Sequence, residues 1–133
     1  MKTFFVTGGA GFIGGNFILH LMKTNQTKIV NYDKLTYAGN LDTLVSVETN
    51  PHYTFEQGDI CDKNRLKNLF EKHAIDAVVH FAAESHVDRS IEAPGDFIQT
   101  NIVGTHELLE VTRWYWQELS ATRKKNFRFL HVS

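Results

Sequence analysis

Short apolar runs alternate with longer stretches of helical period along this chain of 133 residues. The first run, at 3–7, is apolar on both faces, which is typical of a strand buried on both sides of a sheet. Similar runs at 28–33, 53–57, 77–81 and 127–133 predict four more strands. Strands that alternate with helices in this way predict an α/β fold with a parallel sheet.

The stretches between these runs carry apolar residues at helical spacing. After the first run, Ile13, Phe17 and Leu21 recur every four residues, with Ile18 and Met22 beside them. A short helix is expected near 41–47. A further helix is expected to begin at the N-cap Asp62 and to bury its apolar side, which consists of Leu66, Leu69 and Phe70.

A long helix is predicted from Pro94 onward. Its apolar stripe, interrupted by Gly104, consists of Ile98, Ile102, Leu108, Leu109, Thr112 and Trp116. The aromatic residues at 114–116 fit either the core or a contact between subunits, because aromatic residues at helical spacing serve both purposes.

Right-handed crossovers between the strands give the order 3-2-1-4-5, a Rossmann-type doubly wound sheet. The fifth strand then lies at an edge, and the sequence ends inside it. We therefore expect residues 1–133 to form one domain of this type, truncated in its fifth strand, at the start of a longer protein.

Composition narrows the function classes. Lys plus Arg is 14 and Asp plus Glu is 15, and this balance argues against a nucleic-acid-binding surface. The lone Cys61 excludes an intramolecular disulfide and a cysteine-cluster metal site. The seven histidines lack the spacing of zinc ligands, and no apolar run reaches the roughly 18 residues of a membrane span. A cytoplasmic protein without bound metal is the expectation.

Five of the nine glycines lie between positions 8 and 15. In the spacing Gly8-x-x-Gly11-x-x-Gly14, the first glycine permits a tight turn, and the second lets a pyrophosphate approach the backbone. The third permits close packing of the following helix. The N-terminus of that helix would face the anion. The alternative is a glycine-rich turn that holds no ligand.

Asp33 ends the second predicted strand, 19 positions after Gly14. A dinucleotide-binding motif places an acidic residue there to accept hydrogen bonds from the ribose hydroxyls. Its carboxylate would repel a 2′-phosphate, which favours NAD over NADP, although the neighbouring Lys34 could offset that charge. The alternative is an ordinary aspartate at a strand end.

Asp59 ends the third predicted strand at the same edge of the sheet. Its carboxylate could accept a hydrogen bond from an adenine amino group while Ile60 lies against the ring. An aspartate in a Gly-Asp turn more often serves the turn alone.

The loop after the fourth strand leaves the sheet at the edge where doubly wound folds bind ligands. Ala82 and Ala83 give close access to a flat ligand, and His86 is a candidate acid or base, or a hydrogen-bonded loop histidine. Arg89 could bind a substrate phosphate or pair with Asp88. Thr100 and Asn101 could face the same cleft or bond the neighbouring backbone.

Together these strings resemble the extended short-chain dehydrogenase/reductase family. TGGAGFIG at 7–14 is shared by many of its sugar-nucleotide enzymes. DKLTYAGN at 33–40, GDICD at 58–62, HFAAESHVDRSI at 80–91 and TNIVGT at 100–105 are similar to the family of dTDP-glucose 4,6-dehydratases. The resemblance covers essentially the whole chain.

The resemblance implies a set of residues that bind NAD. They are Gly8, Gly11, Phe12, Ile13, Gly14, Asp33, Lys34, Leu35, Thr36, Asp59, Ile60, Phe81, Ala82, Ala83, Ser85 and Thr100. Ser85 and His86 would also touch the nucleotide-sugar substrate, dTDP-glucose. A homodimer of the longer protein is implied, built on helices that include the region Gly95 to Trp116.

The family's reaction oxidises C4 of the sugar, eliminates water across C5 and C6, and returns the hydride to C6. It requires a tyrosine–lysine pair, an acid and a base. In the family a Thr-Asp-Glu segment follows directly after the His-Val-Ser string, with which this chain ends at Ser133, and the tyrosine–lysine motif lies further on. The chain by itself is therefore expected to contain no catalytic residues and to be inactive.

Three alternatives remain open. A related epimerase or decarboxylase acting on another nucleotide sugar would share the same motifs. A non-catalytic regulator that binds a dinucleotide would share the fold. A binding module whose turn holds no ligand is the third.

Overall fold

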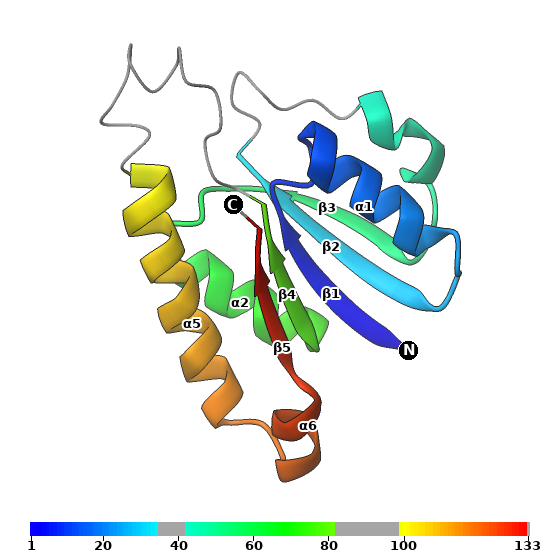
Figure 1. The fold of residues 1–133 in the computed structure, drawn as a ribbon. Helices are drawn as coiled ribbons and strands as arrows, with labels where there is room; N and C mark the ends of the chain where they lie inside the picture. Colours follow the sequence, from blue (N-terminus) through cyan, green and yellow to red (C-terminus); the bar gives the residue numbers. More distant parts are fainter. Residues whose placement is uncertain (35–41, 82–98, 133) are drawn as a thin grey trace.

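Five parallel strands form one sheet in the computed structural model, which describes residues 1–34, 42–81 and 99–132, with the backbone alone at 99–101 (Figure 1). The strands are β1 (Lys2–Thr7), β2 (Thr27–Asp33), β3 (Tyr53–Gln57), β4 (Ala77–His80) and β5 (Arg128–His131). Their order is β3-β2-β1-β4-β5, and each neighbouring pair is parallel. The predicted order and the predicted edge position of the fifth strand are confirmed.

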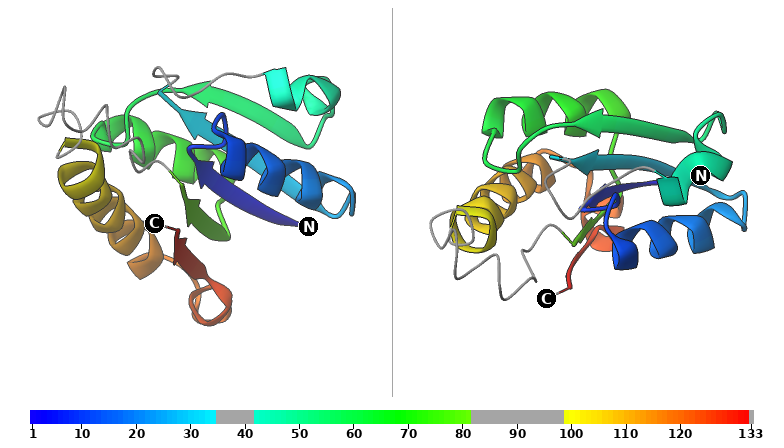
Figure 2. Two further views of the ribbon diagram at one scale, coloured as in Figure 1. Left: turned by 45° about the horizontal axis from the view of Figure 1, so that its top comes forward. Right: turned by 90° about the horizontal axis from the view of Figure 1, so that it is seen from above.

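Helices cover both faces of this sheet (Figure 2). They are α1 (Phe12–Met22), the 3₁₀-helix η1 (Asp42–Val47), α2 (Lys63–His73), the π-helix η2 (Gln99–Gly104), α5 (Thr105–Gln117) and α6 (Ala121–Asn126). The helix α1 packs on one face, and α2 and α5 pack on the other. No helix in the described ranges is long and apolar enough to cross a membrane.

Successive side chains of the central strands point to opposite faces of the sheet and pack in two separate hydrophobic cores. Phe5 of β1 and Val78 of β4 point toward α2 and α5, where the buried cluster includes Leu66, Phe70 and Leu108. The next residues of the same strands, Val6 and Val79, point toward α1 and η1, where they meet Ile18, Met22, Leu44 and Val47. Strands with two buried faces explain why the predicted runs are apolar throughout.

The buried face of α1 differs from the predicted one. Its buried positions are Gly14, Gly15, Ile18 and Met22, whereas Ile13 is 65% exposed. The two glycines face the turn after β1, where a Cβ on Gly14 would collide with the Gly8 carbonyl and a Cβ on Gly15 would lie 3.3 Å from the Gly9 carbonyl. Ile13 is thereby left at the surface.

The predicted stripe on the long helix is correct only in part. The helix buries Leu108, Val111, Thr112 and Tyr115, while Ile102, Leu109 and Trp116 are exposed. The π-helical turn of η2 ends at Gly104, so a count at ordinary helical period that starts at Ile98 loses register there. Of the aromatic residues, Tyr115 belongs to the core and donates a hydrogen bond to the Ile75 carbonyl at 2.9 Å.

The helix α2 begins and ends on well-defined caps. The carboxylate of Asp62 accepts a hydrogen bond from the backbone N–H of Arg65 at 3.2 Å, which confirms the predicted N-cap. At the other end, Ala74 adopts a left-handed conformation with φ 51° and ψ 60°. A residue with a Cβ is strained in that region, and glycine is not.

We expect Ala74→Gly to raise the free energy of unfolding by roughly 0.5–1 kcal/mol, because relief of the left-handed strain exceeds the added entropy of the unfolded chain. Urea denaturation measures the change. Ala121→Gly, in the right-handed helix α6, is the matched control and should lower the same quantity. A loss of stability in both variants would contradict the strain at Ala74.

Candidate functional site

The carboxyl ends of the parallel strands meet at one edge of the sheet. β1 ends at Thr7, β2 at Asp33 and β4 at His80, and Asp59 follows β3 after Gly58. Parallel sheets of this type bind ligands in the crevice outside this edge. The candidate residues predicted on three different strands are therefore brought to one side of the molecule.

The turn between β1 and α1 is held by its own backbone. Gly8 has a φ of 75°, a conformation that side chains disfavour. Its N–H donates to the Tyr32 carbonyl of β2 at 3.1 Å, and the Gly11 N–H donates back to the Gly8 carbonyl at 3.1 Å. The predicted tight turn at Gly8 is confirmed, and the turn is attached to β2 as well as to β1.

Two further glycines permit this geometry by close approach. A Cβ on Gly14 would collide with the carbonyl oxygen of Gly8, and a Cβ on Gly9 would collide with the side-chain amide of Asn31. The predicted packing role of Gly14 is confirmed in part, since the neighbour that it approaches is the turn itself. The requirement at Gly9 was not predicted, because it depends on a residue 22 positions away.

Asp33 joins the end of β2 to the glycine turn. Its carboxylate oxygen Oδ2 accepts a hydrogen bond from the backbone N–H of Ala10 at 2.9 Å. The side chain therefore lies toward the turn, on the side of the sheet edge where a phosphate would sit. One carboxylate both orders the turn and stands beside the space above it.

The first turn of α1 offers donors to an anion. The N–H groups of Phe12, Ile13 and Gly14 have no partner within the helix, because an α-helix leaves its first donors unpaired. The N-cap Gly11 has no side chain to satisfy them, and no acidic residue lies in the first turn. Among the described residues, a Cβ on Gly11 would meet the Gly8 carbonyl alone, at an ordinary contact distance of 3.4 Å.

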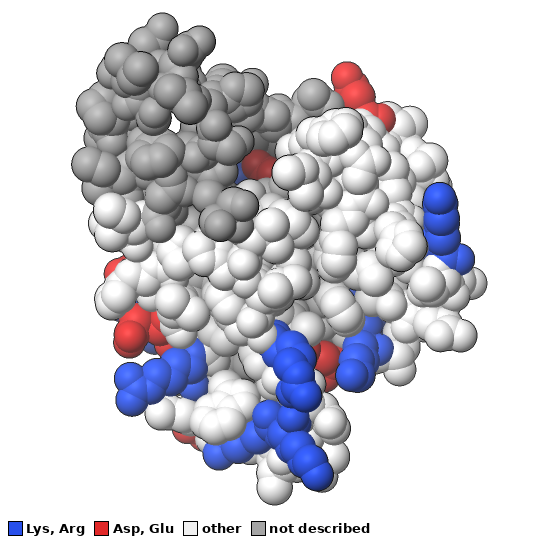
Figure 3. All heavy atoms as spheres, in the orientation of Figure 1, with Lys and Arg blue, Asp and Glu red and all other residues white. Residues whose placement is uncertain are grey.

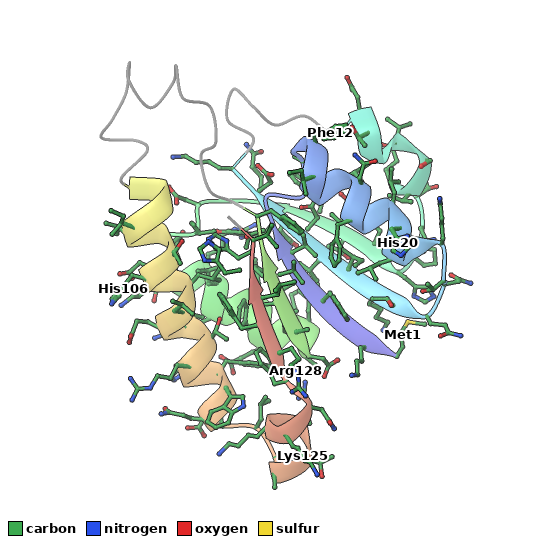
Figure 4. The ribbon with its side chains drawn as sticks, in the orientation of Figure 1. Met1, Phe12, His20, His106, Lys125 and Arg128 are labelled. Carbon is green, nitrogen blue, oxygen red and sulfur yellow. The ribbon has the colours of Figure 1, made fainter. Side chains whose placement is uncertain are left out.

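Two exposed apolar side chains lie at the start of α1, directly after this turn. Phe12 is 83% exposed and projects from the top of α1 beside the glycine turn (Figure 4), and Ile13 is also exposed. Lys and Arg, in contrast, lie mostly over the lower half of the face shown in Figure 3, around α6. At the turn itself, the backbone N–H groups and the helix dipole attract an anion.

Asp59 is held by two donors after the end of β3. Its Oδ1 accepts from the Cys61 N–H at 2.9 Å, and its Oδ2 lies 3.3 Å from the ammonium nitrogen of Lys34. Burial acts to raise the pKa of Asp59, but the Cys61 N–H and the Lys34 charge outweigh it and hold the pKa below its usual value. The carboxylate is ionised near neutral pH, and Lys34 is paired with it.

The backbone at Asp59 is fixed from the core. The Tyr32 hydroxyl, in a fully buried side chain, donates to the Asp59 carbonyl at 2.7 Å, and burial raises the pKa of this phenol far above its usual value. A Cβ on Gly58 would occupy the place of that hydroxyl. The side chain of Ile60 is buried in the core between the sheet and α2, although it was expected to face an adenine ring.

A buried histidine connects three elements at the sheet edge. The His80 Nδ1 lies 2.6 Å from the Thr7 hydroxyl, and its Nε2 lies 2.9 Å from the Thr105 hydroxyl of α5. The Phe81 N–H donates to the same Thr7 oxygen at 3.2 Å. Burial lowers the pKa of His80 to about 4, and the stacked ring of His131 adds to the effect. His80 is therefore neutral near pH 7 and connects β4 to β1 and α5 through hydrogen bonds.

Several predicted site residues cannot be compared with the structure. Leu35, Thr36, Ala82, Ala83, Ser85, His86, Asp88 and Arg89 lie outside the described residues, and only the backbone of Thr100 and Asn101 is described. Phe81 is described, and the centroid of its ring lies 5.4 Å from that of Phe17 of α1. In the described part of the chain, no cluster of metal-ligating side chains is present.

Sequence reasoning missed Asn31 and the buried connection through His80. Each is a polar side chain within an apolar strand that is fully buried in the structure. That pattern indicates a hydrogen-bonded interior group, so polar residues inside the predicted strands were the available signal.

Comparison with known proteins assigns the chain to a family. A family model described as GDP-mannose 4,6 dehydratase matches residues 5–133. The chain belongs to this family. A dTDP-glucose 4,6-dehydratase of Xanthomonas campestris pv. campestris is 59% identical over 133 residues, which is the whole of this chain and 38% of that protein. The chain thus spans little more than a third of the length of this relative.

Solved structures share the fold of the chain. A dTDP-glucose 4,6-dehydratase from Bacillus anthracis in complex with NAD has a TM-score of 0.83 and 33% identity, over all of this chain and 37% of that one. A UDP-glucose 4-epimerase has a TM-score of 0.79 and 30% identity, over 99% of this chain and 35% of that one. The family fold thus serves dehydratases and epimerases alike.

The neutral state of His80 predicts a pH dependence of stability. The unfolded histidine titrates near pH 6.5, whereas the folded one titrates near pH 4. The contribution of neutral His80 to the free energy of unfolding is therefore fully present above about pH 6.5. It decreases by roughly 3 kcal/mol as the pH drops to about 4.

Urea unfolding of the chain and of His80→Gln between about pH 4.5 and 7.5 measures this contribution. The variant should lose stability near neutral pH and show a shallower decline toward acid. His20→Gln, at an exposed position of α1 (Figure 4), is the matched control. An equal change of slope in both variants would assign the effect to some other group.

Proposed function

We propose that this chain is the NAD-binding portion, residues 1–133, of a dTDP-glucose 4,6-dehydratase. The observation that carries the proposal is the glycine turn, whose Ala10 N–H is held by the carboxylate of Asp33 while the donors at the start of α1 stand beside it. The named relatives and the NAD complex from Bacillus anthracis support it.

Among the described residues, NAD would be bound at three places. A pyrophosphate would bind over Gly11 at the N-terminus of α1, where a Cβ would meet one atom of the described residues, the Gly8 carbonyl oxygen. The ribose hydroxyls would donate to Asp33, and the adenine amino group to Asp59. The predicted residues of the loop after β4, with Ser85 and His86 toward the sugar, complete the proposed site.

NAD, when bound, supplies the hydride acceptor and donor of the dehydratase reaction. The residues of this chain would bind NAD and orient it. Phe12 and Ile13 would cover the phosphates with apolar surface and exclude water. Phe81, fixed through Thr7 and His80, would form the base of the pocket. The acid, the base and the tyrosine–lysine pair are proposed to lie outside this chain.

We also propose that the complete enzyme is a homodimer. Exposed apolar side chains gather along η2 and α5, namely Ile102, Val103, Leu109 and Trp116. Together they lie on the helix region where the family resemblance implies a subunit contact. A surface of this kind favours burial against another protein.

NAD binding is expected to respond differently to two glycine variants. Gly11→Ala leaves the free turn intact, because the added Cβ lies at an ordinary contact distance, but it places a methyl group under the pyrophosphate. Its free energy of unfolding should change by less than about 0.5 kcal/mol, while its affinity for NAD falls at least about tenfold. Calorimetric titration with NAD measures the affinity.

Gly14→Ala is the matched comparison for Gly11→Ala. Its Cβ would collide with the Gly8 carbonyl, so both stability and NAD affinity should fall. Unchanged NAD affinity in Gly11→Ala would contradict a pyrophosphate over this turn. A complete lack of NAD binding by the unaltered chain would contradict the proposed function.

The chain alone is expected to form no 4-keto sugar from dTDP-glucose in the presence of NAD, since the proposed acid and base lie elsewhere. Product analysis by mass spectrometry after prolonged incubation tests this expectation. Turnover by the purified chain would show that its own residues suffice for catalysis. It would also favour His86, the predicted acid or base, as the first residue to substitute.

A further inference from the structure

The ends of β2 and β3 bring three charged groups together beside the proposed ribose site. Asp33 ends β2 with its carboxylate directed to the Ala10 N–H. Lys34 follows it, and its ammonium group lies 3.3 Å from the carboxylate of Asp59. Two carboxylates and one ammonium group leave this corner of the described site with a net negative charge.

Lys34 directly follows Asp33, the proposed ribose-binding residue, so its charge affects the choice between NAD and NADP. A cation next to the ribose-binding acid is the kind of group that accepts the 2′-phosphate of NADP, and an unpaired Lys34 would offset the repulsion from Asp33. A phosphate monoester carries up to two negative charges. The direction in which the ammonium group is drawn therefore affects which dinucleotide binds.

The backbone around this corner favours the pairing with Asp59. The Gly58 N–H donates to the Asp33 carbonyl at 3.1 Å, which fixes the end of β2 against the turn after β3. The Asp59 carbonyl is held by Tyr32 at 2.7 Å, and its side chain is held by the Cys61 N–H at 2.9 Å. Asp59 is thus a fixed acceptor, and the long lysine side chain crosses to it.

We propose that Asp59 is a specificity-determining residue, which draws Lys34 across the ends of β2 and β3, away from the position of a 2′-phosphate, and thereby favours NAD over NADP. This inference rests on the proposed function, because it requires a dinucleotide at the glycine turn. It adds the carboxylate that follows β3 to the selection made by Asp33 at the end of β2. Arg65 of α2 pairs with Glu56 at 2.8 Å.

The test compares dissociation constants for NAD and NADP, measured by calorimetry in the whole chain at low salt. Asp59→Asn keeps an oxygen for the Cys61 N–H and removes the charge that holds Lys34. Its loss of any adenine contact affects both dinucleotides equally. The ratio of the NADP constant to the NAD constant should therefore fall about three- to tenfold.

Two further variants separate this effect from general damage. In Asp59→Asn combined with Lys34→Met, the ratio should return to that of Lys34→Met alone, because no ammonium group remains to bind the phosphate. Glu56→Gln removes a neighbouring carboxylate that pairs with Arg65, and should leave the ratio unchanged.

A ratio in Asp59→Asn within twofold of the unaltered chain, with NAD still bound, would overturn the inference and leave the proposed function standing. An equal fall in Glu56→Gln would also overturn it, since the effect would then be one of general charge. Failure of the unaltered chain to bind either dinucleotide would overturn both.

Discussion

The close approach of Gly14 to the Gly8 carbonyl determines where the first helix begins. A Cβ at that position would push α1 away from the turn, and the donors at the start of the helix would then no longer converge above Gly11. The same packing buries Ile18 and Met22 against the sheet. The lack of a side chain at Gly14 thus determines both the packing of the core on one face of the sheet and the geometry of the proposed phosphate site.

The site is assembled by contacts that run from one strand end to the next. Asp33 of β2 holds the turn after β1, Lys34 reaches the carboxylate after β3, and His80 of β4 bonds Thr7 of β1. Such connections can form because a parallel sheet places all its carboxyl ends at one edge. Each connection also passes through or beside a buried residue, so the site and the core are stabilised together.

Sequence patterns predicted the strands, their order, the turn at Gly8 and the cap at Asp62, since each depends on local chemistry or on the handedness of crossovers. The predicted apolar stripe of the long helix was correct at Leu108 and Thr112 but not at Ile102, Leu109 and Trp116, because a π-helical turn before α5 shifts the register. The need for glycine at Gly9 and the link through His80 depend on residues distant in sequence. Periodicity within a segment carries no information about such partners.

Tyr32 has a consequence for how this protein could change over time. Its ring belongs to the aromatic packing with Phe5, at 5.4 Å, while its hydroxyl sets the backbone of Asp59. A substitution that repacks the core behind β2 would shift the Tyr32 ring. Through the hydroxyl of Tyr32, it would therefore also shift the backbone of Asp59 at the surface. Selection on the packing of the interior and selection on the proposed adenine contact would therefore act on the same side chain.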